Sequence, residues 1–275
     1  MRIFVTNDDG IDSTGLHVLA RSLVPFGEVI IGAPDTEYSG ASSSFGPLHL
    51  IRPEMQKAYI DGVDEAWAVN GPPALCVMFA RLGAFGPPFD LVVSGINPGA
   101  NVGRSVYHSG TIGAALTARN GGITGIAVSQ AVDEGGYLGQ GLELMLKNQK
   151  WHSAAEAAAI AVSCLVDKPL SEAEVLNINV PNLEIDDIKG WVDTEVGTNL
   201  IRSMSEVSVE PKLGHEGTYH LKMSWGDRLP DPPIETDVGA VSRGYISLSW
   251  LSRLSREDPP TGSTIEEAFT ENFLS

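Results

Sequence analysis

The chain has 275 residues, of which 43% are hydrophobic and 19% are charged. These proportions are typical of a globular protein with one large domain, or one domain with an extension, and they exclude long disordered or collagen-like regions. Lys and Arg number 18 against 35 Asp and Glu, which gives a net charge of −17. Because like charges repel, we expect no nucleic acid polymer as a partner.

Membrane and redox signals are missing from the sequence. No apolar run approaches the ~18 residues of a spanning helix, and the N-terminus turns acidic at Asp8 and Asp9 before an apolar signal-peptide centre forms. We therefore expect no membrane partner and a cytoplasmic location. The two cysteines, Cys76 and Cys164, lie far apart in apolar stretches, and we expect both to be buried structural thiols.

Strand-like and helix-like segments alternate along most of the chain. We expect the following strands: 3–6, 29–31, 90–94, 126–129 and 175–180. We expect the following helices between them: one capped by Ser13 or Thr14, one beginning at Pro72-Pro73, and those at 112–119 and 154–166. This alternation predicts an α/β fold with a doubly wound, mainly parallel sheet.

The pattern changes beyond about residue 190. Alternating apolar and polar residues predict an antiparallel strand at 219–225, and 245–251 is also strand-like. The sequence Ser263-Thr264-Ile265-Glu266 is typical of a capping box at the start of a short helix. We therefore divide the chain into an α/β catalytic core (1–190), a β-rich arm with the final core strand (191–255) and a C-terminal tail helix (256–275).

Oxygen-bearing side chains follow three of the expected strands. Asp8 and Asp9 come after the first strand. Ser39 follows the second strand after a short loop, and Asn97 follows the strand at 90–94. Ligands bind beyond the carboxyl ends of strands in open α/β sheets, and this donor set suits Mg²⁺ or Mn²⁺. The acidic pair alone is typical of a turn, but two adjacent carboxylates repel each other without a cation, so we predict one divalent metal site.

A glycine-rich segment from Gly95 to Thr111 carries neutral hydrogen-bond donors. Asn101, Ser109 and Thr111 suit phosphate oxygens, and Thr111 opens an alanine-rich helix whose free N–H groups favour an anion. A capped helix after a flexible loop is the alternative interpretation. The Gly-Lys-Ser/Thr phosphate loop and the G-x-G-x-x-G dinucleotide motif are both absent.

Several ordered motifs make the sequence resemble the stationary-phase survival protein (SurE) family of metal-dependent nucleotide phosphatases. A weaker match over 236–248 extends the resemblance through most of the chain. The main matching segments are Thr6-Asn7-Asp8-Asp9-Gly10-Ile11, Ala33-Pro34-Asp35, Ser39-Gly40-Ala41-Ser42, Asn70-Gly71-Pro72-Pro73, Leu91 to Asn97 with Gly99 and Asn101, and Ser109-Gly110-Thr111.

The resemblance implies a Rossmann-like core, with a β-hairpin arm and a C-terminal segment that make homodimer or homotetramer contacts. It also implies a site for one divalent ion, Mg²⁺ or Mn²⁺, and a phosphate site around it. The implied metal ligands are Asp8, Asp9, Ser39 and Asn97, and the implied phosphate-binding residues are Gly40, Asn101, Ser109, Gly110 and Thr111. The sequence departs from the family at Thr36-Glu37-Tyr38 and at His108, which bears on substrate preference.

We expect hydrolysis of nucleoside monophosphates, at the 5′ or 3′ phosphate, by attack of a metal-activated water. Asp8, Asp9 and Asn97 form the expected catalytic centre, and His108 is a candidate for protonating the leaving alkoxide. Direct attack by Asp8 or Asp9 is an alternative route. Two other readings stay open: a non-catalytic metal-dependent nucleotide-binding protein, and a nucleotide-sugar glycosyltransferase, which the early position of the acidic pair disfavours.

Overall fold

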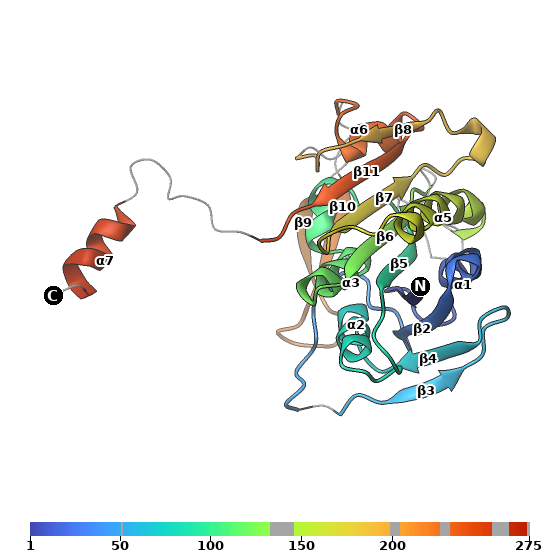
Figure 1. The fold of residues 1–275 in the computed structure, drawn as a ribbon. Coiled ribbons are helices and arrows are strands. Elements are labelled where there is room, and N and C mark those ends of the chain that lie inside the picture. The colour runs from blue at the N-terminus through green and yellow to red at the C-terminus, as the bar shows by residue number, and fades with distance from the viewer. Residues whose placement is uncertain (51, 133–145, 199–203, 226–231, 255–263, 274–275) are drawn as a thin grey trace.

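The computed structural model describes residues 1–50, 52–132, 146–198, 204–225, 232–254 and 264–273. Within these ranges, a nine-stranded sheet with the order β3-β4-β2-β1-β5-β6-β7-β11-β8 forms the centre of the molecule (Figure 1). Its strands are β1 (Arg2–Thr6), β2 (Glu28–Pro34), β3 (Met55–Ala58), β4 (Glu65–Val69), β5 (Leu91–Pro98), β6 (Thr124–Gln130), β7 (Val175–Val180), β8 (Trp191–Asp193) and β11 (Ile246–Leu251).

The sheet is mainly parallel. The neighbours β4, β2, β1, β5, β6 and β7 all run in one direction. The edge strand β3 pairs with β4 in the antiparallel sense, and β11, which lies between β7 and the edge strand β8, pairs with β7 in the antiparallel sense. The chain builds outward from β1 to β2 and β4 on one side, then returns to β5 on the other side. The predicted doubly wound α/β fold is therefore confirmed.

Helices cover both faces of this sheet (Figure 1). The helices α1 (Thr14–Leu23) and α5 (Trp151–Asp167) pack on one face, and α2 (Pro73–Arg81) and α3 (Gly110–Asn120) pack on the other. Because both faces are covered, Leu91, Val92 and Val93 of β5 are all almost fully buried. This double burial explains the continuous apolar run that predicted the strand. Short 3₁₀ turns occur at η1 (Val24–Phe26), η2 (Gly103–Tyr107) and η4 (Ile185–Asp187).

Strand β5 extends further than the sequence predicts. Its register with β6 shifts between Ser94 and Asn97, after which Asn97 pairs with Ser129 and Pro98 pairs with Gln130. The peptide bond between Gly95 and Ile96 is cis. Cross-strand pairing thus continues to Pro98 and holds Asn97 within the sheet, where the sequence predicts a loop.

The two cysteines differ in their surroundings. Cys76 is buried, as expected, and burial raises the pKa of its thiol. Cys164 is exposed, so the expectation of a buried thiol is wrong there. The buried stripe of α5 runs through Ala154, Ala158 and Val162, and Cys164 lies outside this stripe on the helix.

The segment from 191 to 255 contains strands of both the main sheet and a separate hairpin. The hairpin consists of β9 (Met204–Pro211) and β10 (Tyr219–Trp225), which pair only with each other in the described part of the chain. Strands β8 and β11 belong to the main sheet, and the short helix α6 (Asp237–Ser242) precedes β11. The strand predicted at 219–225 is confirmed.

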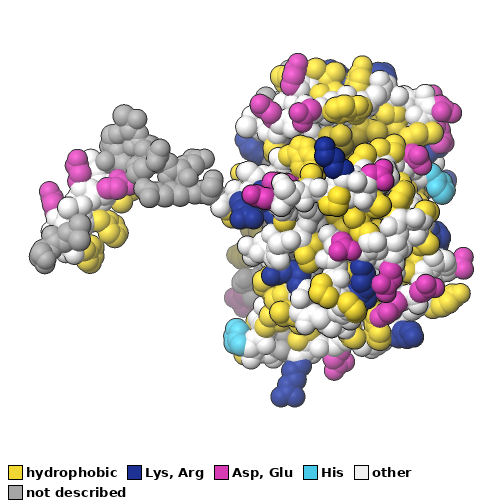
Figure 2. All heavy atoms as spheres, viewed as in Figure 1, with side chains coloured by type: hydrophobic (Ala, Val, Ile, Leu, Met, Phe, Trp, Pro, Cys, Tyr) yellow, Lys and Arg dark blue, Asp and Glu magenta, His cyan; other side chains and the backbone are white. Residues whose placement is uncertain are grey.

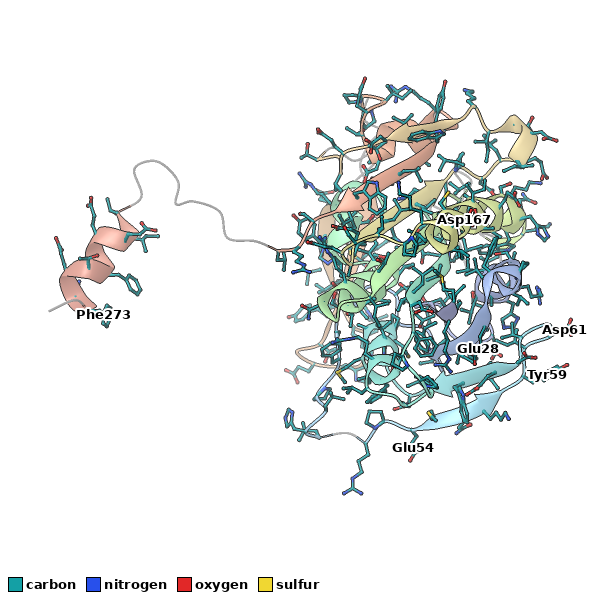
Figure 3. The ribbon with its side chains drawn as sticks, viewed as in Figure 1. Glu28, Glu54, Tyr59, Asp61, Asp167 and Phe273 are labelled. Atoms are coloured by element: carbon teal, nitrogen blue, oxygen red, sulfur yellow. The ribbon has the colours of Figure 1, made fainter. Side chains whose placement is uncertain are left out.

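The C-terminal helix α7 (Ile265–Phe273) stands apart from the rest of the molecule (Figure 1). Its apolar side chains gather on one side (Figure 2). Phe269 and Phe273 contact each other at 5.4 Å between ring centroids, and both are more than half exposed. Phe273 lies near the outer end of the helix (Figure 3). The expected cap residue Ser263 lies outside the described residues. In the ranges that the structure covers, no helix has the length and apolar character needed to span a bilayer.

Candidate active site

The site lies where β1 and β5 run side by side at the centre of the sheet. The chain leaves these two strands toward opposite sides of the sheet, which makes their carboxyl ends a topological switch point. Asp8 and Asp9 directly follow β1, and Asn97 is near the end of β5. The fold therefore brings three of the four expected metal ligands together at the carboxyl ends of the central strands, which we call the acidic edge.

Asp8 is 3% exposed and lies against the N-terminus of α3. The hydroxyl of Thr111 donates a hydrogen bond to Asp8 Oδ1 at 2.7 Å. A Cβ atom on Gly110 would lie 2.8 Å from Asp8 Oδ2, so only glycine fits there without a shift. Burial raises the pKa of Asp8, while hydrogen bonds from the Thr111 side chain and from the backbone of Thr111 and Gly110 lower it. The helix N-terminus thus supports a carboxylate that burial alone disfavours.

Asp9 is the less satisfied of the two acidic groups. Its Oδ2 atom is buried and has no hydrogen-bond partner among the described residues. Burial, followed by repulsion from Asp8 and Glu37, raises the pKa of Asp9 to about 8. A buried carboxylate oxygen without a donor is unfavourable unless a proton or a cation neutralises it. The carboxylate of Asp9 is therefore the group in this site that a bound cation or proton would stabilise most.

The loop after β2 closes over the same edge. The backbone N–H of Tyr38 donates to the carbonyl of Asp8 at 2.7 Å. This bond ties the residue before Ser39 to the acidic pair. Ser39 itself is exposed. Gly40 adopts a φ of +81°, which side chains rarely allow, and a Cβ there would meet no atom within 4 Å. This open backbone leaves room for a ligand above Gly40.

Asn97 is half-buried, and its Nδ2 donates to the carbonyl of Gly99 at 2.6 Å. This bond uses the amide nitrogen inside the loop, so the side-chain oxygen is the atom that can bind a cation. Two carboxylates, an amide oxygen and a hydroxyl form a hard oxygen donor set that fits Mg²⁺ or Mn²⁺. The described residues contain no cluster of three or more His, Cys, Asp or Glu suited to a metal. The expected set has only two such side chains, so it stays a prediction.

Ser109 caps α3, as its position in the sequence suggests. Its Oγ accepts a hydrogen bond from the N–H of Ile112 at 3.1 Å, and its carbonyl accepts one from Gly113. The first four N–H groups of a helix lack acceptors within the helix. Since the cap satisfies the third and fourth, the N–H groups of Gly110 and Thr111 are the ones directed at the acidic site.

Asn101 is held inside the protein by both of its amide hydrogens. Its Nδ2 donates to Ser129 Oγ at 2.9 Å and, in a longer contact, to Thr111 Oγ1 at 3.4 Å. The Thr111 hydroxyl in turn donates to Asp8. The sequence suggests that Asn101 and Thr111 donate from their side chains to phosphate, but here both donors serve a buried network that leads to Asp8.

His108 follows η2 and directly precedes Ser109, the cap of α3. Its side chain is exposed, and its backbone carbonyl accepts a hydrogen bond from Ser42 at 3.2 Å. This bond connects the loop after β2 to the segment before α3. The role of His108 as an acid for the leaving group stays a prediction.

Asp237, at the start of α6, braces the segment before α3. Its Oδ2 accepts from the N–H of Gly103 at 2.8 Å, and its Oδ1 accepts from Gly197 at 2.8 Å. Burial raises the pKa of Asp237, while these backbone donors lower it. No motif in the sequence predicts a role for Asp237, or for the buried Ser129, Asn177 and Asn179. The available signal was a set of polar residues inside apolar strands, such as Asn177-Ile178-Asn179.

A hollow of about 330 Å³ lies at the same end of the sheet. It is next to the carboxyl ends of β2 and β4, where Asn70 Nδ2 donates to Asp35 Oδ2 at 3.0 Å. Glu54, which lies just before β3 (Figure 3), is one of the residues that line it. The lining residues are Asp35, Arg52, Glu54, Gln56, Ala68 and Asn70.

Comparisons with known proteins show which sequences and structures this chain is similar to. The family model described as "Survival protein SurE" matches residues 3–203. A 5′-nucleotidase SurE from Haemophilus influenzae (strain PittGG) is 36% identical over 250 residues, which cover 90% of each chain. A 5′/3′-nucleotidase SurE from Erwinia tasmaniensis is 36% identical over 251 residues, covering 91% of this chain and 90% of the relative.

The fold is also shared with a solved structure. The crystal structure of the SurE protein from Aquifex aeolicus superimposes with a TM-score of 0.73 at 27% identity. The match covers 98% of this chain and 99% of that one. Sequence and fold agree over nearly the whole length, and the chain therefore belongs to the survival protein SurE family.

Proposed function

We propose that this protein is a phosphatase that hydrolyses nucleoside monophosphates with a divalent cation bound at Asp8, Asp9, Ser39 and Asn97. The observation that carries the proposal is the acidic pair at the switch point, with an unpartnered, buried Asp9 oxygen and a helix N-terminus directed at Asp8. The relatives named as 5′-nucleotidases support the substrate class.

Each part of the site has a chemical role in this proposal. A divalent cation supplies charge neutralisation for the carboxylates, polarises a phosphoryl oxygen and lowers the pKa of a bound water. The N–H groups of Gly110 and Thr111 stabilise negative charge on the phosphate without adding a formal charge. Such neutral donors are valuable in a chain whose net charge is −17. His108 protonates the leaving oxygen from the open side of the site.

The hollow beside the site is where we place the nucleoside. It opens beyond the carboxyl ends of β2 and β4, and the acidic pair follows β1. Because β2 is next to β1 and β4 is next to β2, the hollow lies one to two strands from the acidic pair. Adjacent strands are about 4.8 Å apart. Its carboxylates and amides can bind base edges. Asn70→Ala should raise the KM for a nucleoside monophosphate about tenfold, the effect of roughly 1.4 kcal/mol, without raising the KM for p-nitrophenyl phosphate.

The function is tested by measuring phosphate release from a panel of nucleoside 5′- and 3′-monophosphates. Purified protein is assayed with Mn²⁺, with Mg²⁺ and with EDTA. We expect release that requires a divalent ion and is abolished by EDTA. Nucleotide binding without release would instead identify a non-catalytic binding protein. Radiolabelled phosphate retained on the acid-quenched protein would support direct attack by Asp8 or Asp9 over attack by water.

The partner that we propose is a second copy of the chain, in a homodimer or homotetramer. Across the hairpin, Leu221 pairs with Val209 and Met223 pairs with Val207, and all four side chains are more than half exposed. Helix α7 exposes a further apolar side. Contact between copies at these surfaces would remove this apolar area from water.

A further inference from the structure

Two buried asparagines, Asn177 and Asn179, lie in β7 between β6 and β11. Both are 0% exposed, and alternate residues of a strand share a face of the sheet. Asn179 is directly opposite Ser129 of β6 in the register. A buried amide is unfavourable unless it is hydrogen-bonded, and an apolar residue would avoid this loss. The pair therefore indicates a role other than filling the core.

Both side chains bind the backbone of one residue, Asn101. Asn179 Oδ1 accepts the N–H of Asn101 at 2.7 Å, and its Nδ2 donates to the Asn101 carbonyl at 3.2 Å. Asn177 Nδ2 donates to the same carbonyl at 3.0 Å. Asn101 lies after β5 in a segment without regular structure, so its position is set by three bonds from a strand about 77 residues away in sequence.

The held residue reaches the acidic site through its side chain. Asn101 Nδ2 donates to Ser129 Oγ and to Thr111 Oγ1, and the Thr111 hydroxyl donates to Asp8 Oδ1. Thr111 Oγ1 accepts the side-chain N–H of Asn101 through a lone pair, so the single hydrogen of its hydroxyl is free to be donated to Asp8. The network thus runs from β7 to the Asp8 carboxylate entirely through buried residues.

We propose that Asn177 and Asn179 are positioning residues for the reaction. They fix the backbone of Asn101 so that its side chain and Thr111 orient the Asp8 carboxylate. Asn179 has the larger effect because it makes two of the three bonds. This inference rests on the proposed phosphatase function, and it assigns Asn101 a place behind Asp8.

The test measures Asn179→Ala in steady-state kinetics with a nucleoside 5′-monophosphate and Mn²⁺. Loss of a residue that orients a metal ligand lowers activity or metal affinity about 10- to 100-fold. We expect that decrease in kcat with little change in KM, and a smaller decrease for Asn177→Ala. The second readout is independent of turnover: the rise in melting temperature on adding Mn²⁺ should be smaller for Asn179→Ala than for the wild type.

Asn182→Ala is the matched control. Asn182 also binds backbone groups: its Oδ1 accepts from the N–H of Lys150 at 2.9 Å, and its Nδ2 donates to the carbonyl of Asn148 at 3.3 Å. These bonds are not part of the network to Asp8. It should keep its kcat and its Mn²⁺ response. An equal loss of kcat in Asn182→Ala, at an equal fall in melting temperature, would show that Asn179 acts only through stability and would overturn the proposal.

A double-mutant cycle separates the positioning role from a general structural one. If Asn179 acts through the Asn101 side chain, Asn179→Ala should cause little further loss of kcat in an Asn101→Ala background. Additive losses would overturn the proposal. If Asn179→Ala does not fold, the same cycle with Asn177→Ala decides. A wild type without phosphatase activity contradicts the proposed function, whereas an active wild type with an unaffected Asn179→Ala contradicts this inference alone.

Discussion

The acidic edge of the sheet and the β9–β10 hairpin use their side chains in opposite ways. At the edge, polar groups such as Asp8, Asn101 and Thr111 are buried and bonded to one another. On the hairpin, apolar groups such as Val209 and Leu221 are exposed. Both arrangements are unfavourable for an isolated chain, because burial disfavours charge and water disfavours apolar surface.

This contrast indicates that each region is completed by a different kind of partner. The acidic edge contains an unpartnered carboxylate oxygen on Asp9 and fits a small cation. The hairpin and α7 present apolar area and fit another protein surface. Changes at the edge should therefore affect chemistry, and changes on the hairpin should affect assembly.

The largest effect is expected for Asp9→Asn. Removing one ligand charge from a metal site of this kind weakens transition-state stabilisation by several kcal/mol, which is on the order of 10³-fold in rate. Phosphate release from a nucleoside monophosphate measures it. Asp12→Asn is the control, because Asp12 is an exposed acidic residue three positions away and should leave turnover unchanged. Near-normal turnover by Asp9→Asn would contradict the site.

A smaller loss is expected for Gly110→Ala. The new Cβ would lie 2.8 Å from both Cβ and Oδ2 of Asp8, so it must push the carboxylate away. Displacement of a reacting group by about 1 Å can lower the rate about 10²-fold. The melting temperature should change little, since alanine suits a helix better than glycine.

Gly214→Ala is the hairpin counterpart of this change. A Cβ there meets nothing within 4 Å, although its φ of +78° disfavours alanine. It should leave kcat unchanged. If Gly110→Ala and Gly214→Ala reduce activity equally, the distinction between the two regions fails.

The hairpin itself is tested by Leu221→Lys. A charge at this exposed apolar position should weaken contact between copies and lower the mass measured by light scattering, while the melting temperature of the core stays the same. Ser224→Lys places the same charge on the opposite face of the hairpin and should keep the wild-type mass. An unchanged mass for Leu221→Lys would place the assembly surface elsewhere.

The smallest effect is a pH-dependent change in stability. The pKa of Asp9 is raised from 3.8 to about 8, so the folded protein keeps a proton that the unfolded chain loses. The metal-free protein should therefore lose stability as the pH rises between about 4 and 8, because the unfolded state binds fewer protons there. Melting temperatures in EDTA should show this fall, and Asp9→Asn should reduce it.

Addition of Mn²⁺ at pH 8 should restore the wild-type melting temperature but not that of Asp9→Asn. The reason is that a cation neutralises the carboxylate in the folded state only. Parallel pH profiles for the two proteins in EDTA would show that Asp9 is not the group responsible.

The fold class and the chemistry of the strand ends could be predicted from the amino-acid sequence alone. Apolar runs such as 90–94 identified strands buried on both faces, and their alternation with helices predicted the doubly wound sheet. The acidic pair and the glycine-rich segment from Gly95 to Thr111 were both visible as local patterns. Local patterns are reliable here because backbone geometry and burial act over a few residues.

The sequence did not reveal which hydrogen-bond donors are already paired inside the folded protein. Asn101 and Thr111 look like phosphate ligands in the sequence, but their hydrogens are given to Ser129 and Asp8. The bonds from Asn177 and Asn179 join residues more than 75 positions apart. The exposure of Cys164 likewise depended on which side of α5 meets the sheet. Hydrogen-bond partners and buried faces are set by packing between distant segments, and no local pattern records them.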